Sequence, residues 1–147
     1  ATDGGVLAGY QLVDVKVTVV DGSFNEVDSM PQDYSVAAAM AFRDAARDAE
    51  PVLLEPVMSV EVVTPEASLG DVIGDLNGRR ANIAGMEARG QMQIIKGAVP
   101  LGEMFGYTTV LRSMTQGRAS FTMQVSHYDE VPQAIAEAVV YKMRGGL

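Results

Sequence analysis

The sequence has no cysteine and no tryptophan, and it has a single histidine, His127, among its 147 residues. Without cysteine there is neither a disulfide framework nor a thiolate metal site, and one histidine leaves almost nothing from which to build a zinc centre. No apolar stretch approaches the roughly 20 residues that span a bilayer. Residues 1–11 also lack the basic region and apolar core of a secretion signal. These absences predict a reducing, cytoplasmic setting without a membrane partner or a metal.

The hydrophobic content and the distribution of charge limit the size of the domains and the kind of partner that the chain can have. Hydrophobic residues make up 48% of the chain, which suffices for one ordinary domain or two small ones. The first residue is Ala1 and not methionine, which predicts that the chain begins inside a longer protein. The formal charge of -8 argues against a general nucleic-acid binder, but residues 1–51 carry -6 of it and residues 52–126 only -1. The middle of the chain can therefore present local arginine clusters, such as Arg79-Arg80.

The first third of the chain predicts a strand, a turn and a helix. In residues 10–20 valines alternate with polar residues, a period-two pattern that predicts a half-buried strand. Asp21-Gly22 follows with turn chemistry. Residues 33–50 are rich in strong helix formers, and Pro51 is expected to end that helix.

The middle of the chain repeats a strand and a helix twice. Residues 57–64 are rich in β-formers, and the following helix places an apolar stripe at helical spacing. A hairpin is expected around Arg89-Gly90, then a helix over 101–114 with Phe105 in its apolar stripe, then a strand over 118–125. The order βαββαβ predicts an α+β, ferredoxin-like sandwich with both helices on one face of an antiparallel sheet. A last helix is expected within 129–143, and the Glu50-Pro51 junction is the expected domain boundary.

Motifs for catalysis are scarce. The sequence contains neither a GxxxxGK[ST] phosphate loop nor a GxGxxG after a strand, so it predicts no nucleotide site of its own. A Ser/His/Asp site would have to use His127, for which a structural or exposed histidine is the favoured interpretation. Asp71 and Asp75 lie four residues apart, opposite the apolar stripe of their helix, and are expected to form a solvated acidic face.

One helix carries a less ordinary pattern. Gly70, Gly74 and Gly78 recur every four residues on one side of it, although each glycine costs about 1 kcal/mol relative to alanine. Such a stripe suits the close approach of another backbone, from this protein or from a partner. The adjacent Arg79 and Arg80 are either surface charge that offsets the helix dipole or contacts to RNA phosphate.

Longer motifs carry a family resemblance across essentially the whole chain. The segments "GDVIGDLN" (70–77), "EMFGY" (103–107), "LRSMTQGR" (111–118) and "HYDEVP" (127–132) are highly specific in combination. Together they resemble the carboxy-terminal part of bacterial elongation factor G, the translational GTPase of the ribosome. The resemblance implies that residues 1–51 are the second half of its fourth domain, a partial unit of the ribosomal-protein-S5-domain-2-like α/β type. Residues 52–127 would then be its ferredoxin-like fifth domain, and 128–147 a helix that packs back on the fourth-domain part.

The resemblance also implies a role. GTP and Mg²⁺ would be bound by an amino-terminal domain absent from this chain, so the fragment itself is expected to hold no cofactor and to hydrolyse no GTP. The fourth domain would enter the decoding region behind tRNA and mRNA, while the fifth contacts the stalk base and rRNA of the large subunit. Gly70, Gly74, Gly78, Arg79 and Arg80 are the candidates for rRNA or partner contacts.

The tip that enters the decoding site would be the loop after the first expected strand. The common family pattern has a histidine where this chain has Asn25, and asparagine cannot carry a proton's charge near neutral pH. This difference raises the alternative of an elongation-factor-G-like paralogue acting in ribosome recycling or protection. The candidate tip residues are Asp21, Gly22, Ser23, Phe24 and Asn25.

Two further expectations concern partners. Strands that precede the position of Gly5 in the family are absent here, so the strand over 10–20 would expose unpaired backbone groups and residues 1–50 are expected to pair with a second copy or to be poorly ordered. A remote alternative discards the family and treats the ferredoxin-like part as an ACT-type ligand-sensing module.

Overall fold

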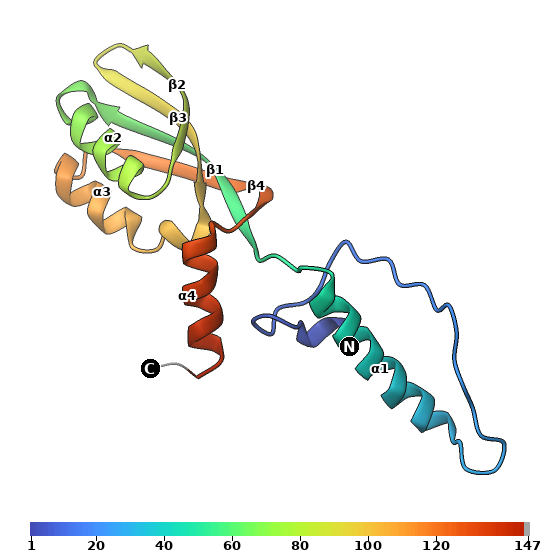
Figure 1. The fold of residues 1–147 in the computed structure, drawn as a ribbon. Coiled ribbons are helices and arrows are strands. Elements are labelled where there is room, and N and C mark those ends of the chain that lie inside the picture. Colours follow the sequence, from blue (N-terminus) through green and yellow to red (C-terminus); the bar gives the residue numbers. More distant parts are fainter. Residues whose placement is uncertain (146–147) are drawn as a thin grey trace. The chain divides into compact units, whose positions relative to one another are not determined.

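The computed structural model describes residues 1–145 and divides the chain into two units (Figure 1). Unit 2 is the continuous stretch Leu54–Glu130. Unit 1 joins Ala1–Leu53 with the described part of Val131–Leu147. Residues 146–147, the end of the expected region 128–147, lie outside the described part of the chain.

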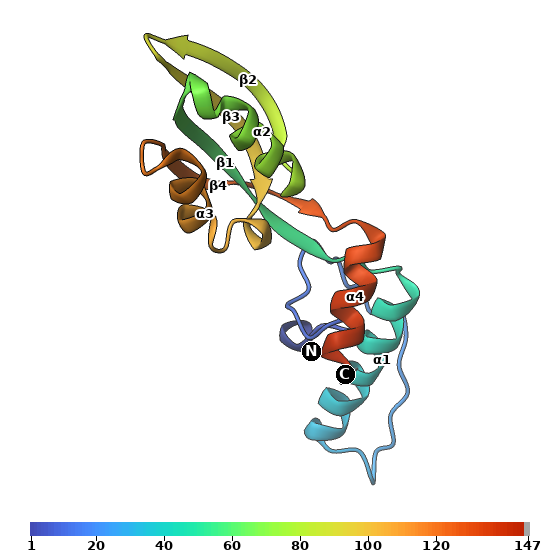
Figure 2. The ribbon, with the colours of Figure 1, turned by 90° about the vertical axis from the view of Figure 1, so that its left-hand side faces the viewer.

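Unit 2 is built on one antiparallel four-stranded sheet. Its strands are β1 (Leu54–Pro65), β2 (Asn82–Arg89), β3 (Met92–Pro100) and β4 (Ser120–Glu130), arranged in the spatial order β2-β3-β1-β4. Helices α2 (Leu69–Gly78) and α3 (Tyr107–Thr115) follow β1 and β3, and both lie on the same face of the sheet (Figures 1 and 2). The predicted α+β, ferredoxin-like order is therefore confirmed.

The core of unit 2 lies between this sheet face and the two helices. On β1 the residues at alternate positions Met58, Val60 and Val62 are buried, as the pleat of a strand dictates. They pack against Val72 and Leu76 of α2, and the cluster continues with Leu111 of α3. Each such side chain contributes about 1.5–3 kcal/mol when it leaves water. The helical stripe predicted for α2 is thus the face that is buried.

Close backbone contact explains one glycine of the sheet. The strands β2 and β3 form a hairpin that turns at Gly90, whose φ of 63° is left-handed. Within the hairpin, a Cβ built on Gly97 would lie 2.8 Å from the carbonyl oxygen of Asn82. A side chain at Gly97 would therefore push the two strands apart, next to the register shift between Ile83 and Gly85.

Two expected boundaries in unit 2 need correction. The helix predicted over 101–114 is broken into a short 3₁₀ turn, Leu101–Glu103, and α3, because Gly106 takes a left-handed φ of 75° between them. The last strand is longer than predicted: β4 reaches Glu130, which pairs with Leu54. Its length moves the start of the final helix, α4 (Gln133–Met143), past Asp129 and Pro132.

Unit 1 contains a short 3₁₀ turn at Thr2–Gly4, the long helix α1 (Pro31–Asp48) and α4. The start of α1 is well specified, since Pro31 fits the first helical position and the carboxylate of Asp33 accepts a hydrogen bond of 2.8 Å from the Met30 N–H. The helix ends before Pro51, as predicted. No residue of α1 is buried, so the helix has no core of its own among the described residues.

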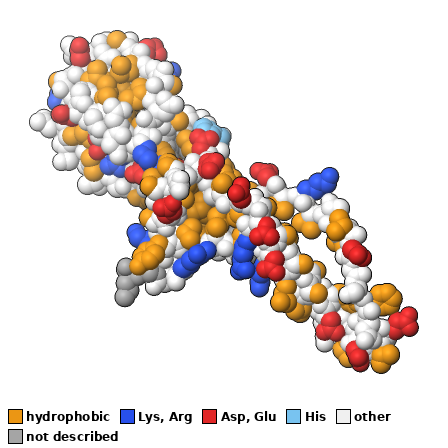
Figure 3. Space-filling model, in the orientation of Figure 1, with side chains coloured by type: hydrophobic (Ala, Val, Ile, Leu, Met, Phe, Trp, Pro, Cys, Tyr) orange, Lys and Arg blue, Asp and Glu red, His pale blue; other side chains and the backbone are white. Residues whose placement is uncertain are grey.

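The strand predicted over residues 10–20 is wrong. That stretch has no strand or helix and runs from Tyr10 to the loop before α1. Its alternating valines, including Val15 and Val17, are exposed and not half-buried. Figures 1 and 3 show the extended segment standing apart from α1, with hydrophobic side chains at the surface along both. A strand needs hydrogen-bonding neighbours, and none of the described residues supplies a ladder for this segment.

Candidate functional site

The predicted tip loop is organised by Asn25, and the turn lies later than predicted. Residues 26–28 form the turn, whereas Gly22 does not adopt a left-handed φ. The carboxamide oxygen Oδ1 of Asn25 accepts hydrogen bonds from the N–H groups of Val27 and Asp28, at 2.9 and 3.3 Å. This is the Asx-turn pattern, in which an asparagine side chain takes the place of a backbone carbonyl. The expectation that Asp21-Gly22 makes the turn is corrected accordingly.

A second pair of bonds closes the same loop. The N–H of Asn25 donates to Oγ of Ser29 at 2.9 Å, and the N–H of Ser29 donates back to the carbonyl of Asn25 at 3.1 Å. Asp21 bonds only to its neighbour, where Oδ1 accepts from the Gly22 N–H at 2.7 Å. The loop thus holds its shape by itself while Phe24 and Val27 remain 69% and 88% exposed.

The glycine stripe of α2 faces open space. Gly70, Gly74 and Gly78 are exposed, and a Cβ built on any of them would meet no atom within 4 Å. The expectation of a neighbouring segment of this protein against the stripe therefore finds no support within unit 2. Contact with an external partner stays a prediction.

Arg79 is held inside unit 2. Its Nε donates to Oδ2 of Asp75 at 2.7 Å, and its Nη1 donates to the carbonyl of Glu103. The guanidinium also lies 4.9 Å from the centre of the Tyr107 ring, a cation–π distance. Of the expected acidic face, Asp71 is exposed, whereas Asp75 is drawn into this pair.

Arg80 is held more strongly still. It donates to both carboxylate oxygens of Glu55, at 2.7 and 2.9 Å, and its Nε donates to Glu103 at 3.2 Å. The hydrogen bond with Glu55 is the main reason that the pKa of Arg80 is raised above its ordinary value, against the opposing effect of burial. The interpretation of Arg79 and Arg80 as plain surface charge is therefore wrong, because both side chains are partly buried and paired. Their contact with RNA phosphate stays a prediction.

The backbone of Arg80 is as unusual as its side chain. Its φ of 59° places a non-glycine residue in the left-handed region just after α2. The Ala81 N–H reaches the Leu76 carbonyl at 3.1 Å and the Arg80 N–H reaches the Asn77 carbonyl at 3.2 Å, the two bonds of a Schellman cap. Glycine normally occupies this position, so the ion pairs of Arg80 offset a backbone cost of about 1–2 kcal/mol.

Tyr107 lies at the centre of the same region and is completely buried. Its ring packs edge-on against Phe121 at 4.9 Å, and within the described residues its hydroxyl has no hydrogen-bond partner. Burial, helped by the charge of Asp75, raises the pKa of Tyr107 to about 12. The ring therefore acts as packing at neutral pH.

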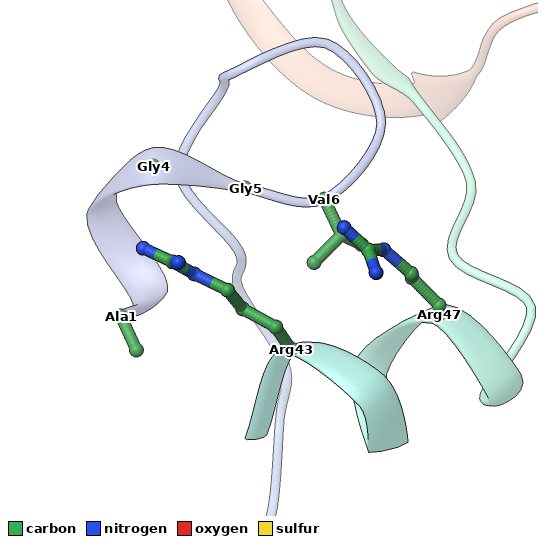
Figure 4. A pocket seen from close by; sticks show the side chains of 6 residues that line it. All are labelled: Ala1, Gly4, Gly5, Val6, Arg43 and Arg47. Atoms are coloured by element: carbon green, nitrogen blue, oxygen red, sulfur yellow. The ribbon is translucent and has the colours of Figure 1, made fainter. Parts of the chain in front are cut away.

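Sequence reasoning missed two features. Phe105 was predicted in an apolar helix stripe, but it is 78% exposed between the buried Met104 and Tyr107. The glycine that follows it was the available signal, since it breaks the helical periodicity. In unit 1, Arg43 and Arg47 point from α1 toward the turn at Gly4 and Gly5 and line a pocket of about 380 Å³ (Figure 4).

His127 is exposed on β4 and hydrogen-bonded at both ring nitrogens. Nδ1 lies 2.9 Å from Oγ of Ser126, and Nε2 lies 2.9 Å from Oδ2 of Asp129. This fits the expected exposed histidine. Among residues 1–145, no group of three or more acidic, histidine or cysteine side chains is placed to hold a metal ion. No helix in the same range combines the length and apolarity needed to cross a membrane.

Comparisons with known proteins give one consistent answer. The family model described as elongation factor G, domain IV, matches residues 1–50, and the one described as elongation factor G C-terminus matches residues 52–139. Elongation factor G of Aquifex pyrophilus is 58% identical over 146 residues, which are 99% of this chain and 21% of that protein.

A solved structure agrees with these matches. A crystal structure of a protein from Thermus thermophilus superposes with a TM-score of 0.82 at 38% identity, over 97% of this chain and 22% of that one. The chain thus spans about a fifth of the length of the relatives it matches. With both family models matched in sequence order, the chain belongs to the elongation factor G family, of which it carries a domain IV part followed by the C-terminal part.

Proposed function

We propose that this chain is the ribosome-contacting part of an elongation factor G that promotes GTP-dependent translocation of tRNA and mRNA. The observation that carries the proposal is the ordered match of both family models over residues 1–50 and 52–139. In terms of the parent protein, residues 1–51 belong to the fourth domain and 52–127 to the fifth, and α4 is the helix that follows them. Since translation takes place in the cytoplasm, the parent works there.

The fragment supplies recognition and steric work, and the parent supplies the energy. The printed sequence has no phosphate loop, so GTP and Mg²⁺ belong to a domain of the parent outside this chain. The loop around Asn25 meets the decoding region, where tRNA and mRNA move. The exposed side of α2, with Gly74 at its middle, meets the large subunit, where a bare backbone permits close approach.

Two other functions fit less well. A recycling or protection paralogue would share both domains, but the match to an elongation factor G at 58% identity does not favour it. An ACT-type sensor has the same ferredoxin-like sandwich, so the fold of unit 2 alone does not distinguish such a sensor from part of an elongation factor G. The family match over residues 1–50, outside that sandwich, does.

Self-association of the isolated chain is a separate part of the proposal. The valines of residues 10–20 are exposed on an extended segment that joins no sheet. An extended apolar segment with free backbone groups is a template for pairing with another chain. A second copy of the same segment would supply the missing ladder.

The absence of cysteine permits a direct test of the ribosome contacts. A single cysteine at Val27 or at Gly74, in a cysteine-free full-length parent, can carry a tethered iron probe that cleaves nearby RNA. The proposal expects cleavage of small-subunit RNA from position 27 and of large-subunit RNA from position 74. A cysteine at Lys96, on the opposite sheet face, is the matched control and should cleave less. Cleavage from none of these positions, with the parent bound, would refute the proposal.

A further inference from the structure

The loop over residues 21–29 presents two apolar side chains in acidic surroundings. Phe24 and Val27 are exposed, and Asp21, Glu26 and Asp28 are exposed beside them. Three carboxylates at one tip repel phosphate groups, so a nucleic acid that meets this loop has to be met through its bases. An exposed phenylalanine offers the stacking surface that unpaired bases use.

Most hydrogen-bonding groups of Asn25 are already engaged within the loop and are not available to bind a base. Its Oδ1 already accepts the N–H groups of Val27 and Asp28, so only its amide nitrogen is free to bond outside the loop. Its backbone N–H and carbonyl are both engaged with Ser29. Every group of Asn25 that could accept a hydrogen bond therefore serves the turn.

The bonds that join the backbone groups of Asn25 to Ser29 also limit the directions open to the residue before Asn25. The paired contacts between Asn25 and Ser29 close a five-residue ring, and the chain leaves that ring toward Phe24. Without the ring, Phe24 would sample many directions, and ordering it on binding would cost conformational entropy. A preformed turn removes most of that cost.

The geometry points to Asn25 as a positioning residue that holds the 26–28 turn and thereby presents Phe24 for stacking on an unpaired base. The inference rests on the proposed function, since it assigns roles within the tip that enters the decoding region. It separates two residues that sequence reasoning treated alike: Phe24 makes the contact, and Asn25 acts through the loop.

The test compares variants of the full-length parent by their translocation rate. Asn25→Ala removes the two side-chain bonds to the Val27 and Asp28 N–H groups, and Ser29→Ala removes the bond that the Asn25 N–H donates to Oγ. Each loss loosens the same loop and is expected to slow translocation about fivefold, the effect of one net hydrogen bond. Because both act through one loop, the double variant should be no slower than either single one. Asn25→Ser keeps a hydroxyl acceptor and should recover part of the rate. Asn82→Ala, at an exposed asparagine of β2, is the matched control.

Phe24 provides the contact arm of the same experiment. Phe24→Ala should slow translocation at least as much as Asn25→Ala, and Phe24→Tyr should restore it, since both rings stack. Thermal unfolding midpoints should stay nearly unchanged in all variants, because Phe24, Asn25 and Asn82 are exposed and Ser29 is only partly buried. In the 147-residue chain, Asn25→Ala should also speed hydrogen exchange at the amides of Val27 and Asp28.

The outcomes separate the inference from the proposed function. If the effects of Asn25→Ala and Ser29→Ala on the rate add, the two side chains do not act through one loop and the inference is wrong. Unchanged exchange at Val27 and Asp28 contradicts it as well. If every variant, including Phe24→Ala, keeps the parent rate, the inference fails. The proposed function then fails only if the RNA cleavage from position 27 is also absent.

Discussion

Arg80 donates two parallel hydrogen bonds to the carboxylate of Glu55, from Nη1 to Oε1 at 2.7 Å and from Nη2 to Oε2 at 2.9 Å. The side chains are only 28% and 17% exposed, so solvent screens this pair less than it screens surface pairs. The contact joins the start of β1 to the end of α2. Glu103 adds a third bond from the turn before α3.

Substitutions at Arg80 separate the side chain from the backbone. Arg80→Ala loses the ion pairs and keeps the left-handed strain, so it should lower the free energy of unfolding by about 2–4 kcal/mol. Arg80→Gly loses the same pairs but relieves the strain, and should be about 1 kcal/mol more stable than Arg80→Ala. Urea unfolding measures both. Arg89→Ala, in an exposed pair with Glu87 at 3.9 Å, is the control, with an expected change below about 0.5 kcal/mol. Equal stability of Arg80→Gly and Arg80→Ala would contradict the account of the cap.

The raised pKa of Tyr107 predicts that the free energy of unfolding falls at alkaline pH. An unfolded tyrosine loses its proton near a pKa of about 10, whereas the pKa of native Tyr107 is raised to about 12. The native state thus keeps a proton that the unfolded state has released. The stabilisation is complete below pH 10 and is lost as the pH rises from 10 to 12, by about 2–3 kcal/mol in total.

Tyr107→Phe removes this titration. Because the buried hydroxyl has no partner within the described residues, the variant should be at least as stable as the parent chain at pH 7. Its advantage should then grow between pH 10 and 12. Urea unfolding across this range measures the difference, with Tyr128→Phe at an exposed tyrosine as the matched control. An advantage of Tyr107→Phe that stays constant with pH would refute the prediction.

Alanine substitutions at two glycines of unit 2 should change the stability of the chain in opposite directions. Gly74→Ala meets open space in a helix and should stabilise the chain by about 0.5–1 kcal/mol. Gly97→Ala places a Cβ 2.8 Å from the Asn82 carbonyl oxygen and should destabilise it. Thermal unfolding of the two variants checks these signs.

The same Gly74 variant tests the proposed contact. If the bare helix surface meets the ribosome, Gly74→Ala in the full-length parent should weaken ribosome binding although it stabilises the protein. Binding at parental strength, measured by pelleting at fixed salt, would mean that the stripe is not a contact.

The exposed valines predict concentration-dependent association of the isolated chain. Val15→Lys combined with Val17→Lys places two charges on the apolar side of the extended segment and should shift the chain to a monomer. The matched control, Asp14→Lys with Thr18→Lys, changes the other side and should associate at least as well as the parent chain. Size-exclusion chromatography with light scattering gives the masses. A monomeric parent chain with strong amide protection over residues 13–19 would contradict self-association.

Local periodicity sufficed for unit 2 because each of its elements packs against another element of the same unit. The valines of β1 and the stripe of α2 have partners within residues 54–130, so pattern and structure agree. The same period-two pattern failed over residues 10–20. A pattern specifies which face a strand would bury but not whether another strand is present to pair with it.

Other features depend on partners that no local pattern identifies. Adjacent arginines gave no sign that Arg80 would reach Glu55, 25 residues earlier, or take a left-handed backbone. The role of Asn25 was readable in principle, since asparagine before a turn is a known Asx-turn signal. The Asp-Gly pair at 21–22 is also a turn signal, and the turn was therefore predicted there and not at residues 26–28.

In the proposed division of roles, residues of this chain act on RNA and a domain of the parent outside it hydrolyses GTP, and one experiment separates the two activities. Residues 21–29 of the full-length parent are replaced by a glycine-serine segment of equal length, and ribosome-stimulated GTP hydrolysis and mRNA movement are timed in the same reaction. The account predicts hydrolysis at the parental rate and movement slowed at least about tenfold, equivalent to about 1.4 kcal/mol of barrier. Movement at the parental rate would contradict it.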